Sequence, residues 1–277
     1  MLEIGSLTVR HYTAWLSGGI LLGLLLILWN GYRHDPDDIT RWLDVGLAAV
    51  LGGLAGARAV HVAVEWDYFT DHHDEITLIR LGGLSWHGAL LTGIPAALAL
   101  AWLRRVPIRA WTDALALAWP VGMVFTWQGC RKAGCGYGLE VTTLADFPDW
   151  QVAELPDVYG LYAPRLELHM AGMLLGGMLL LVMLLLAWQN WLPGVRLWLA
   201  LALTALGMYI VGFFRADPAH TWYDRRADQV LDLALLFFST LIGGTAWLIG
   251  RRPTAANTTE EIHEDHAGSS PDQSNAR

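Results

Sequence analysis

Both cysteines of this chain lie in one glycine-rich stretch that follows apolar sequence. Cys130 and Cys135 fall within Gly129–Gly138, a run of ten residues that also holds four glycines. Glycine weakens helices and permits unusual backbone angles, so the run predicts irregular backbone rather than a stable membrane helix. Irregular backbone at the edge of a bilayer survives only where protein or a wet cavity surrounds it. The stretch therefore predicts a cavity.

These cysteines are compatible with more than one chemistry. A disulfide would form in an oxidising compartment, whereas a nucleophilic cysteine would need a neighbouring base such as His87. A metal site needs three or four ligands at tetrahedral spacing, and the sequence completes no such set. We interpret His72, His73 and Asp74 as a solvated loop. We therefore expect no metal site, and the disulfide stays open.

Polar side chains recur at one end of the apolar stretches. Arg58, His61 and Glu65 are spaced three and four apart, which places them on one helical face. If the amino terminus faces outward, further polar residues reach the same level: Tyr12, His87, Glu167, His169, Arg215, Asp228, Gln229 and Asp232. Such groups are costly in a membrane and indicate function. Arginine and histidine near helix ends can instead extend to the headgroups, but the asymmetry between the two faces favours a polar cavity.

The elements that must position these residues are membrane helices. The chain has 277 residues, of which 54% are hydrophobic and 16% charged, whereas soluble domains carry nearer a quarter of charged residues. Seven apolar stretches approach the length needed to cross a hydrocarbon core, at about 12–30, 43–65, 84–103, 111–127, 167–189, 195–214 and 228–249. We predict an all-α integral membrane protein with seven transmembrane helices and a polar cavity near the outer leaflet.

The domain organisation follows from the same pattern. We expect one transmembrane domain over 1–250, with an irregular outer loop at about 128–165, and a disordered polar tail over 251–277. Basic residues divide evenly between the two sides, so they do not set the orientation. The pairs Arg104-Arg105 and Arg251-Arg252 favour their own side as cytoplasmic. The amino terminus is then outside and the tail is cytoplasmic.

Glycines spaced four apart predict where helices pack closely. Small residues at this spacing let two helix backbones approach each other. The pairs are Gly19 and Gly23, Gly52 and Gly56, and Gly172 and Gly176. We interpret them as packing positions rather than as sites.

Five motifs follow one another along the chain. They are Ile4-Gly5 with Arg10-His11-Tyr12; Gly56-Ala57-Arg58; Ser85-Trp86-His87-Gly88 with Gly93; Gly129-Cys130 with Ala133-Gly134-Cys135-Gly136-Tyr137-Gly138; and Phe213-Phe214-Arg215 with Asp217-Pro218 and Asp228-Gln229. In this order, on matching helices, they resemble the prolipoprotein diacylglyceryl transferase family from about residue 4 to 240. The third motif is the most specific.

The resemblance implies a transfer reaction at the outer leaflet of the bacterial plasma membrane. The family moves the diacylglyceryl group of phosphatidylglycerol to the thiol of a lipobox cysteine, next to the signal peptide of a prolipoprotein, and glycerol phosphate leaves. The expected partners are therefore phosphatidylglycerol, the prolipoprotein and the lipid bilayer. No cofactor and no nucleic acid are expected.

The resemblance also implies roles for residues. His87, Arg215 and Glu167 are the expected catalytic residues, with His87 either as the base that makes the thiolate or as a residue that orients the substrate. Arg58 and Arg215 would hold phosphate, because arginine suits bidentate phosphate contacts. The expected substrate-binding residues are Tyr12, Arg58, His61, Gly134, Tyr137, Gly138, Gln229 and Arg131.

Three of the departures from the family pattern remove expected charged residues. Trp127 stands where the family has an arginine before the glycine-rich stretch, and Met208 and Gly212 stand where another arginine and a glutamate are expected. Arg131 and Lys132 are candidates to restore positive charge from new positions. Two alternative functions follow: a catalytically impaired homologue that binds phospholipid or lipopeptide, and a transferase with a different acceptor.

Overall fold

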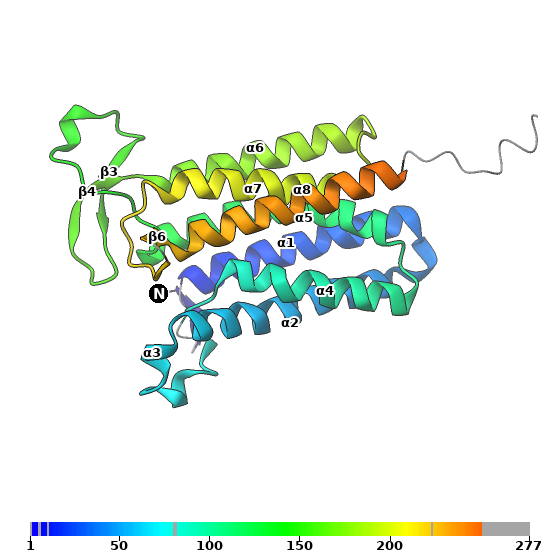
Figure 1. Ribbon diagram of the computed structural model, residues 1–277, viewed down its shortest axis with the longest axis horizontal. Coiled ribbons are helices and arrows are strands. Elements are labelled where there is room, and N and C mark those ends of the chain that lie inside the picture. Colours follow the sequence, from blue (N-terminus) through cyan, green and yellow to red (C-terminus); the bar gives the residue numbers. More distant parts are fainter. Residues whose placement is uncertain (1, 5–6, 10, 80–81, 223, 251–277) are drawn as a thin grey trace, which may run out of the picture.

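A computed structural model describes residues 2–4, 7–9, 11–79, 82–222 and 224–250 of the chain. Within this part, long helices dominate and lie side by side along the long axis of the molecule (Figure 1). The expected tail over 251–277, together with Gly5 and Arg10 of the first motif, lies outside the described residues.

The helices and strands follow one another in a simple order. The helices are α1 (His11–His34), α2 (Ile39–Val64), α3 (Trp66–Phe69), α4 (Trp86–Arg104), α5 (Ile108–Ala133), α6 (Leu168–Trp188), α7 (Arg196–Gly212) and α8 (Ala227–Gly250). Three antiparallel hairpins add β1 (Leu2–Ile4) with β2 (Leu7–Val9), β3 (Val152–Pro156) with β4 (Tyr162–Leu166), and β5 (Thr221–Trp222) with β6 (Arg225–Arg226). The largely helical architecture agrees with the sequence prediction, which did not include the hairpins.

Five helical segments of the described chain are long and apolar enough to cross a membrane. They are His11–His34, Pro36–Val64, Trp86–Arg104, Leu168–Trp188 and Ala227–Gly250. Helix α7 is apolar but shorter, and α5 is not in this set. The structure thus supports a multi-pass membrane protein.

Glycines determine how closely α2 and α4 pack. A Cβ atom added at Gly88 would overlap the carbonyl oxygen of Gly56, so neither helix tolerates a side chain at this crossing. The hydroxyl of Thr92 donates across the same interface to the carbonyl oxygen of Gly52 at 2.6 Å. The close approach and the shared hydrogen bond place the first turn of α4 against the last turns of α2.

The other two glycine pairs also lie at helix contacts. A Cβ atom at Gly19 of α1 would lie 2.8 Å from the Cβ of Phe125 in α5, and one at Gly176 of α6 would lie 2.9 Å from Val124 of α5. Gly23 and Gly172 face α5 in the same way. The prediction that these glycines are packing positions is confirmed.

Helix α5 ends later than the glycine content of the sequence suggested. The expected stretch ended at residue 127, but α5 continues to Ala133 and includes the first residues of the glycine-rich run. Of the four glycines of the run, Gly129 lies within the helix. Gly134 then ends the helix with φ of +72°, a left-handed conformation that favours glycine. The expectation of irregular backbone was therefore wrong for residues 129–133.

Candidate functional site at the end of the bundle

Most of the expected site residues lie at one end of the helix bundle. Helices α1, α4, α6 and α8 begin there, and α2, α5 and α7 end there. The hairpin β3–β4 and the short helix α3 extend beyond the long helices at the same end (Figure 1). This end therefore gathers polar residues from every long helix.

Backbone pairing joins three of these helix ends. The segment after α5 is hydrogen-bonded on one side to the residues after α7: Leu139 N–H donates to the Phe214 carbonyl at 2.9 Å, and Ala216 N–H donates to Tyr137 at 3.0 Å. On its other side, Leu166 N–H donates to the Leu139 carbonyl at 3.0 Å. The end of the glycine-rich stretch therefore lies between the segment after α7, which carries Arg215, and strand β4, which leads into α6.

Arg215 lies in a closed ring of two arginines and two aspartates. Its Nε and Nη2 donate to both carboxylate oxygens of Asp217 at 2.9 and 2.5 Å, and its Nη1 donates to Asp228 at 2.9 Å. Arg226 donates to Asp228 from Nε at 3.2 Å and to the Asp217 carbonyl from Nη1 at 2.8 Å. We call these four residues the arginine–aspartate ring. Its formal charges sum to zero.

The ring also affects the ionisation of Arg215. Burial alone would lower the pKa of the Arg215 guanidinium, but the hydrogen bonds and charges of Asp217 and Asp228 outweigh it and raise that pKa. Arg215 is therefore a permanent cation at this end of the bundle.

His87 is paired with a buried carboxylate from another helix. Its Nε2 lies 2.8 Å from Oδ1 of Asp232, although α4 and α8 are far apart in sequence. The two side chains are 10% and 3% exposed. The indole ring of Trp86 lies against the imidazole with ring centroids 3.9 Å apart. Asp232 thus holds the edge of the His87 ring that carries Nε2, and Trp86 covers one face of that ring.

Glu167 lies at the centre of a second charged cluster. Its Oε1 is 2.9 Å from Nδ1 of His169 and its Oε2 is 3.3 Å from Nε of Arg131. Burial would raise the pKa of the Glu167 carboxyl, but the hydrogen bond and charge of His169, with a further contribution from Arg131, outweigh it and lower that pKa. Glu167 is therefore an anion between two basic side chains, one of which, Arg131, the sequence singled out.

The cluster continues into the glycine-rich stretch. Nε2 of His169 lies 2.8 Å from the carbonyl oxygen of Cys135. Cys130 and Cys135 form a disulfide, which settles the question that the sequence left open. The disulfide spans the end of α5, so the carbonyl that faces His169 belongs to a segment closed by a covalent bond.

Trp127, which stands where the resemblance led us to expect an arginine, is packed between α6 and the glycine-rich stretch. Its indole lies against His169 with ring centroids 6.1 Å apart. A Cβ atom at Gly172 would overlap the same indole, and one at Gly136 would lie 3.1 Å from it. Two glycines thus make room for the tryptophan, which is buried.

Gly212 has a similar packing reason. A Cβ atom at this position would lie 2.7 Å from Cγ of Gln229. Gln229 is buried, and its amide nitrogen donates to the carbonyl of Tyr209 at 3.2 Å. A glutamate at position 212 would therefore compete with Gln229 for the same space.

Arg58 is bound to backbone oxygens rather than to carboxylates. Its guanidinium donates to the carbonyls of Ile76 at 2.8 Å, Gly82 at 2.8 Å, Gly83 at 3.2 Å and Glu75 at 2.5 Å. The side chain ties the end of α2 to the loop that leads into α4. It is buried in the structure.

A cavity of about 310 Å³ lies beside Arg58. His61 lines it, packed edge-on against Phe69 with ring centroids 5.8 Å apart. Glu65 and Gly83 contribute to the same wall. The structure thus brings His61 and Arg58 together. Among the described residues, neither side chain is in direct contact with the arginine–aspartate ring.

The remaining expected residues pack around the glycine-rich stretch. Tyr12 of α1 lies against Gly129 of α5. Tyr137 is buried, with the guanidinium carbon of Arg165 4.7 Å from its ring centroid. Burial raises the pKa of the Tyr137 hydroxyl, and the charge of Asp157 adds to the rise, so the hydroxyl stays protonated. Gly138 has no room for a Cβ atom, because Leu166 occupies that space.

A known family model matches this chain over most of its length. The model of the family described as prolipoprotein diacylglyceryl transferase matches residues 1–245. The chain belongs to this family. The resemblance drawn from the five motifs is therefore confirmed.

Individual relatives are similar at modest identity. The phosphatidylglycerol–prolipoprotein diacylglyceryl transferase of Acaryochloris marina is 34% identical over 116 residues, which span 41% of each chain. The protein of the same name from Symbiobacterium thermophilum is 32% identical over 164 residues, 56% of each chain. The one from Rhodopseudomonas palustris is 26% identical over 271 residues, 92% of each chain. The alignments to the Acaryochloris protein and to three cyanobacterial relatives of the same name span about two fifths of the length of those proteins.

Sequence reasoning missed the partners of the family residues. It noted Asp228 and Asp232 as polar residues of the last helix but did not pair Asp232 with His87, and it did not include Arg226. A signal existed, because a carboxylate within a membrane helix needs a partner. The sequence alone does not say which cation or ring supplies it.

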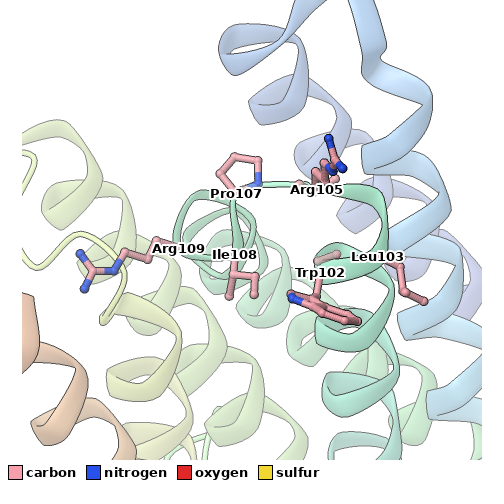
Figure 2. Close-up of a pocket in the computed structure, with 8 residues that line it drawn as sticks. Trp102, Leu103, Arg105, Pro107, Ile108 and Arg109 are labelled. Atoms are coloured by element: carbon pink, nitrogen blue, oxygen red, sulfur yellow. The ribbon is translucent and has the colours of Figure 1, made fainter.

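The opposite end of the bundle has a different character. A groove of about 690 Å³ lies at the turn between α4 and α5. Figure 2 shows Trp102, Leu103 and Ile108 lining it, with Arg105 and Arg109 pointing away from each other. Its lining is mostly apolar, and none of the expected site residues lies in it.

Proposed function

We propose that this chain transfers the diacylglyceryl group of phosphatidylglycerol to the cysteine thiol of a prolipoprotein. The substrate cysteine lies in the lipobox that follows a signal peptide. The reaction takes place at the outer leaflet of a bacterial plasma membrane. In this proposal seven helices cross the membrane, the amino terminus is outside, the tail is cytoplasmic, and the polar end of the bundle forms the headgroup cavity.

The observation that carries the proposal is the family match over residues 1–245. The relatives named above carry this activity in their names. The geometry supports it, because the polar end offers a histidine with a carboxylate partner and arginines beside it. These are the groups that thiol activation and phosphate departure need.

In the proposed reaction, His87 removes the proton of the incoming thiol. The thiolate attacks the glycerol carbon that carries the phosphate, so a C–S bond forms and the C–O bond to the phosphate breaks. The phosphate oxygen takes the electron pair, and glycerol phosphate leaves. Arg215 stabilises the leaving charge by exchanging a carboxylate of the arginine–aspartate ring for phosphate oxygens.

The other expected residues shape the site. Glu167 holds the glycine-rich stretch in two ways, directly through Arg131 and through His169, which lies against the carbonyl of Cys135. Gly134, Tyr137 and Gly138 belong to the same stretch. Tyr12 packs beside it, Gln229 packs against Gly212 at the end of α7, and Arg58 with His61 lines the cavity at the end of α2. We propose that these residues bind the lipid headgroup and the lipobox segment.

Complementation tests the proposal in cells. A strain depleted of its own transferase should grow when it expresses this chain and should fail with an inactive His87→Asn variant made at the same level. Growth failure with the unaltered chain, when it is present and inserted in the membrane, would contradict the proposal.

A second candidate function is that of a catalytically impaired homologue that binds phospholipid or lipopeptide. The observation that favours it is the engagement of both expected phosphate-holding arginines, Arg58 by backbone carbonyls and Arg215 by carboxylates. This candidate predicts saturable binding of phosphatidylglycerol without product formation. A transfer assay with the purified chain separates the two.

A further inference from the structure

One ring nitrogen of His87 is engaged by a carboxylate. Nε2 lies 2.8 Å from Oδ1 of Asp232, and Nδ1 makes no hydrogen bond within the part of the chain that the structure describes. A carboxylate only accepts hydrogen bonds, so Nε2 must carry the proton of a neutral ring. The lone pair of the neutral ring then belongs to Nδ1.

The charged groups around this pair are already bonded to one another. Asp228 lies one turn before Asp232 on α8 and binds Arg215 and Arg226. Asp217 binds the same two arginines. Asp232 differs from these two aspartates, because in the described chain its side chain makes one hydrogen bond, to His87.

We propose that Asp232 is a positioning residue that selects the tautomer of His87 with Nδ1 as the proton acceptor. This inference rests on the proposed transferase function. The thiol proton moves to Nδ1 while the thiolate forms its C–S bond and the phosphate oxygen leaves with the C–O electron pair. His87 is then an imidazolium, and the adjacent Asp232 carboxylate stabilises its charge.

The isosteric variant Asp232→Asn tests the role. Its amide has lost the negative charge and can donate to Nε2, which would stabilise the wrong tautomer. We expect kcat to fall about 10²-fold or more, while KM for phosphatidylglycerol changes less than about threefold. The pH dependence of kcat should change as well, because the ring has lost its charged partner. Asp232→Glu should restore part of the rate.

Matched variants separate this role from a structural one. Asp224→Asn alters an exposed aspartate of the same region and should leave kcat and the pH profile unchanged. Asp232→Asn should add nothing to the loss caused by His87→Asn, because both act through one ring. Additive losses, or an Asp232→Asn enzyme with normal kcat and pH profile, would overturn the inference.

A spectroscopic measurement works without turnover and without an Asp232 variant. In ¹⁵N-histidine-labelled protein, the His87 signals are assigned by their absence in His87→Asn. The inference predicts a protonated Nε2 and an unprotonated Nδ1 at neutral pH, and the opposite pattern would overturn it. If the unaltered protein shows the predicted tautomer but transfers nothing, the proposed function fails while the positioning geometry stands.

Discussion

Two arginines at the same end of the bundle are held in opposite ways. Arg58 donates to four backbone carbonyls and makes no ion pair among the described residues. The guanidinium of Arg215, in the described part of the chain, donates to carboxylates alone, with two bonds to Asp217 and one to Asp228. The first arrangement fixes a loop, and the second neutralises a charge.

This difference separates the roles that the family motifs suggest for the two residues. Carbonyls that follow one another in a loop cannot be replaced by a ligand unless the loop moves. A carboxylate on a side chain can be replaced by a phosphate of similar geometry with the loss of one ion pair. We therefore expect Arg215 to act in the chemical step, and Arg58 to act on substrate binding by holding the loop that lines the cavity at the end of α2.

The largest expected effect is loss of transfer in Arg215→Gln. In the proposed reaction the departing phosphate loses the arginine that stabilises its charge, so the rate of transfer should fall about 10²–10³-fold, measured as product per minute at saturating lipid. The exposed neighbour Arg225 supplies the control, since Arg225→Gln removes a charge outside the arginine–aspartate ring. Equal losses in both variants would show that only overall charge matters.

Arg58→Gln should instead reduce stability. Hydrogen bonds from a charged donor contribute about 1.5–3 kcal/mol each, and glutamine can replace only some of them, so a loss of about 3 kcal/mol is expected. Thermal unfolding in detergent should show a lower midpoint, and a glutamate-specific protease should cut faster after Glu75 in the released loop. A normal midpoint combined with lost transfer would place Arg58 in the chemistry and break the comparison.

Asp217→Asn should tighten lipid binding. The variant removes one of the two carboxylates that compete with phosphate for Arg215, so the ring gains a net positive charge. A change of about 1 kcal/mol corresponds to a KM for phosphatidylglycerol lowered about fivefold. The same variant should not change the binding of a neutral diacylglycerol. An unchanged or raised KM would mean that Asp217 does not compete with the substrate.

The smallest expected effect is a pH dependence of stability that depends on Glu167. Burial alone would raise the folded-state pKa of this carboxyl, but the hydrogen bond and charge of His169 outweigh burial, and the pKa is lowered. Its contribution is therefore present above the ordinary glutamate pKa of about 4.3 and is lost as the pH falls through the lowered folded value. Glu167→Gln should lower the unfolding midpoint at pH 7 and make it less sensitive to acid. A parallel acid response in both proteins would contradict this assignment.

Much of the fold followed from apolar length and glycine spacing. Membrane helices must satisfy their own backbone, so long apolar runs become helices whatever the local propensity. Gly56 and Gly176 were correctly placed at helix contacts. Gly129 misled the prediction of the α5 end, because a single glycine within a helix held by its neighbours does not break it.

The site was predictable as a set of residues and not as a set of pairs. The sequence brought His87, Arg215 and Glu167 to one end of the bundle through helix direction alone. It did not give the contact of His87 with Asp232 or of Glu167 with His169, because those depend on the rotation of each helix about its axis. Trp127 showed as a lost arginine in the motif, whereas its fit against Gly172 needed the packed structure.

The most direct test of the central claim is a transfer assay with purified protein. Phosphatidylglycerol in mixed micelles is incubated with a lipobox peptide, and the peptide is examined by mass spectrometry. The account predicts a diacylglyceryl thioether on the peptide cysteine, equimolar release of glycerol phosphate, and no product with a cysteine-to-serine peptide. An unmodified peptide in the presence of folded, lipid-binding protein would contradict the account and favour the impaired homologue.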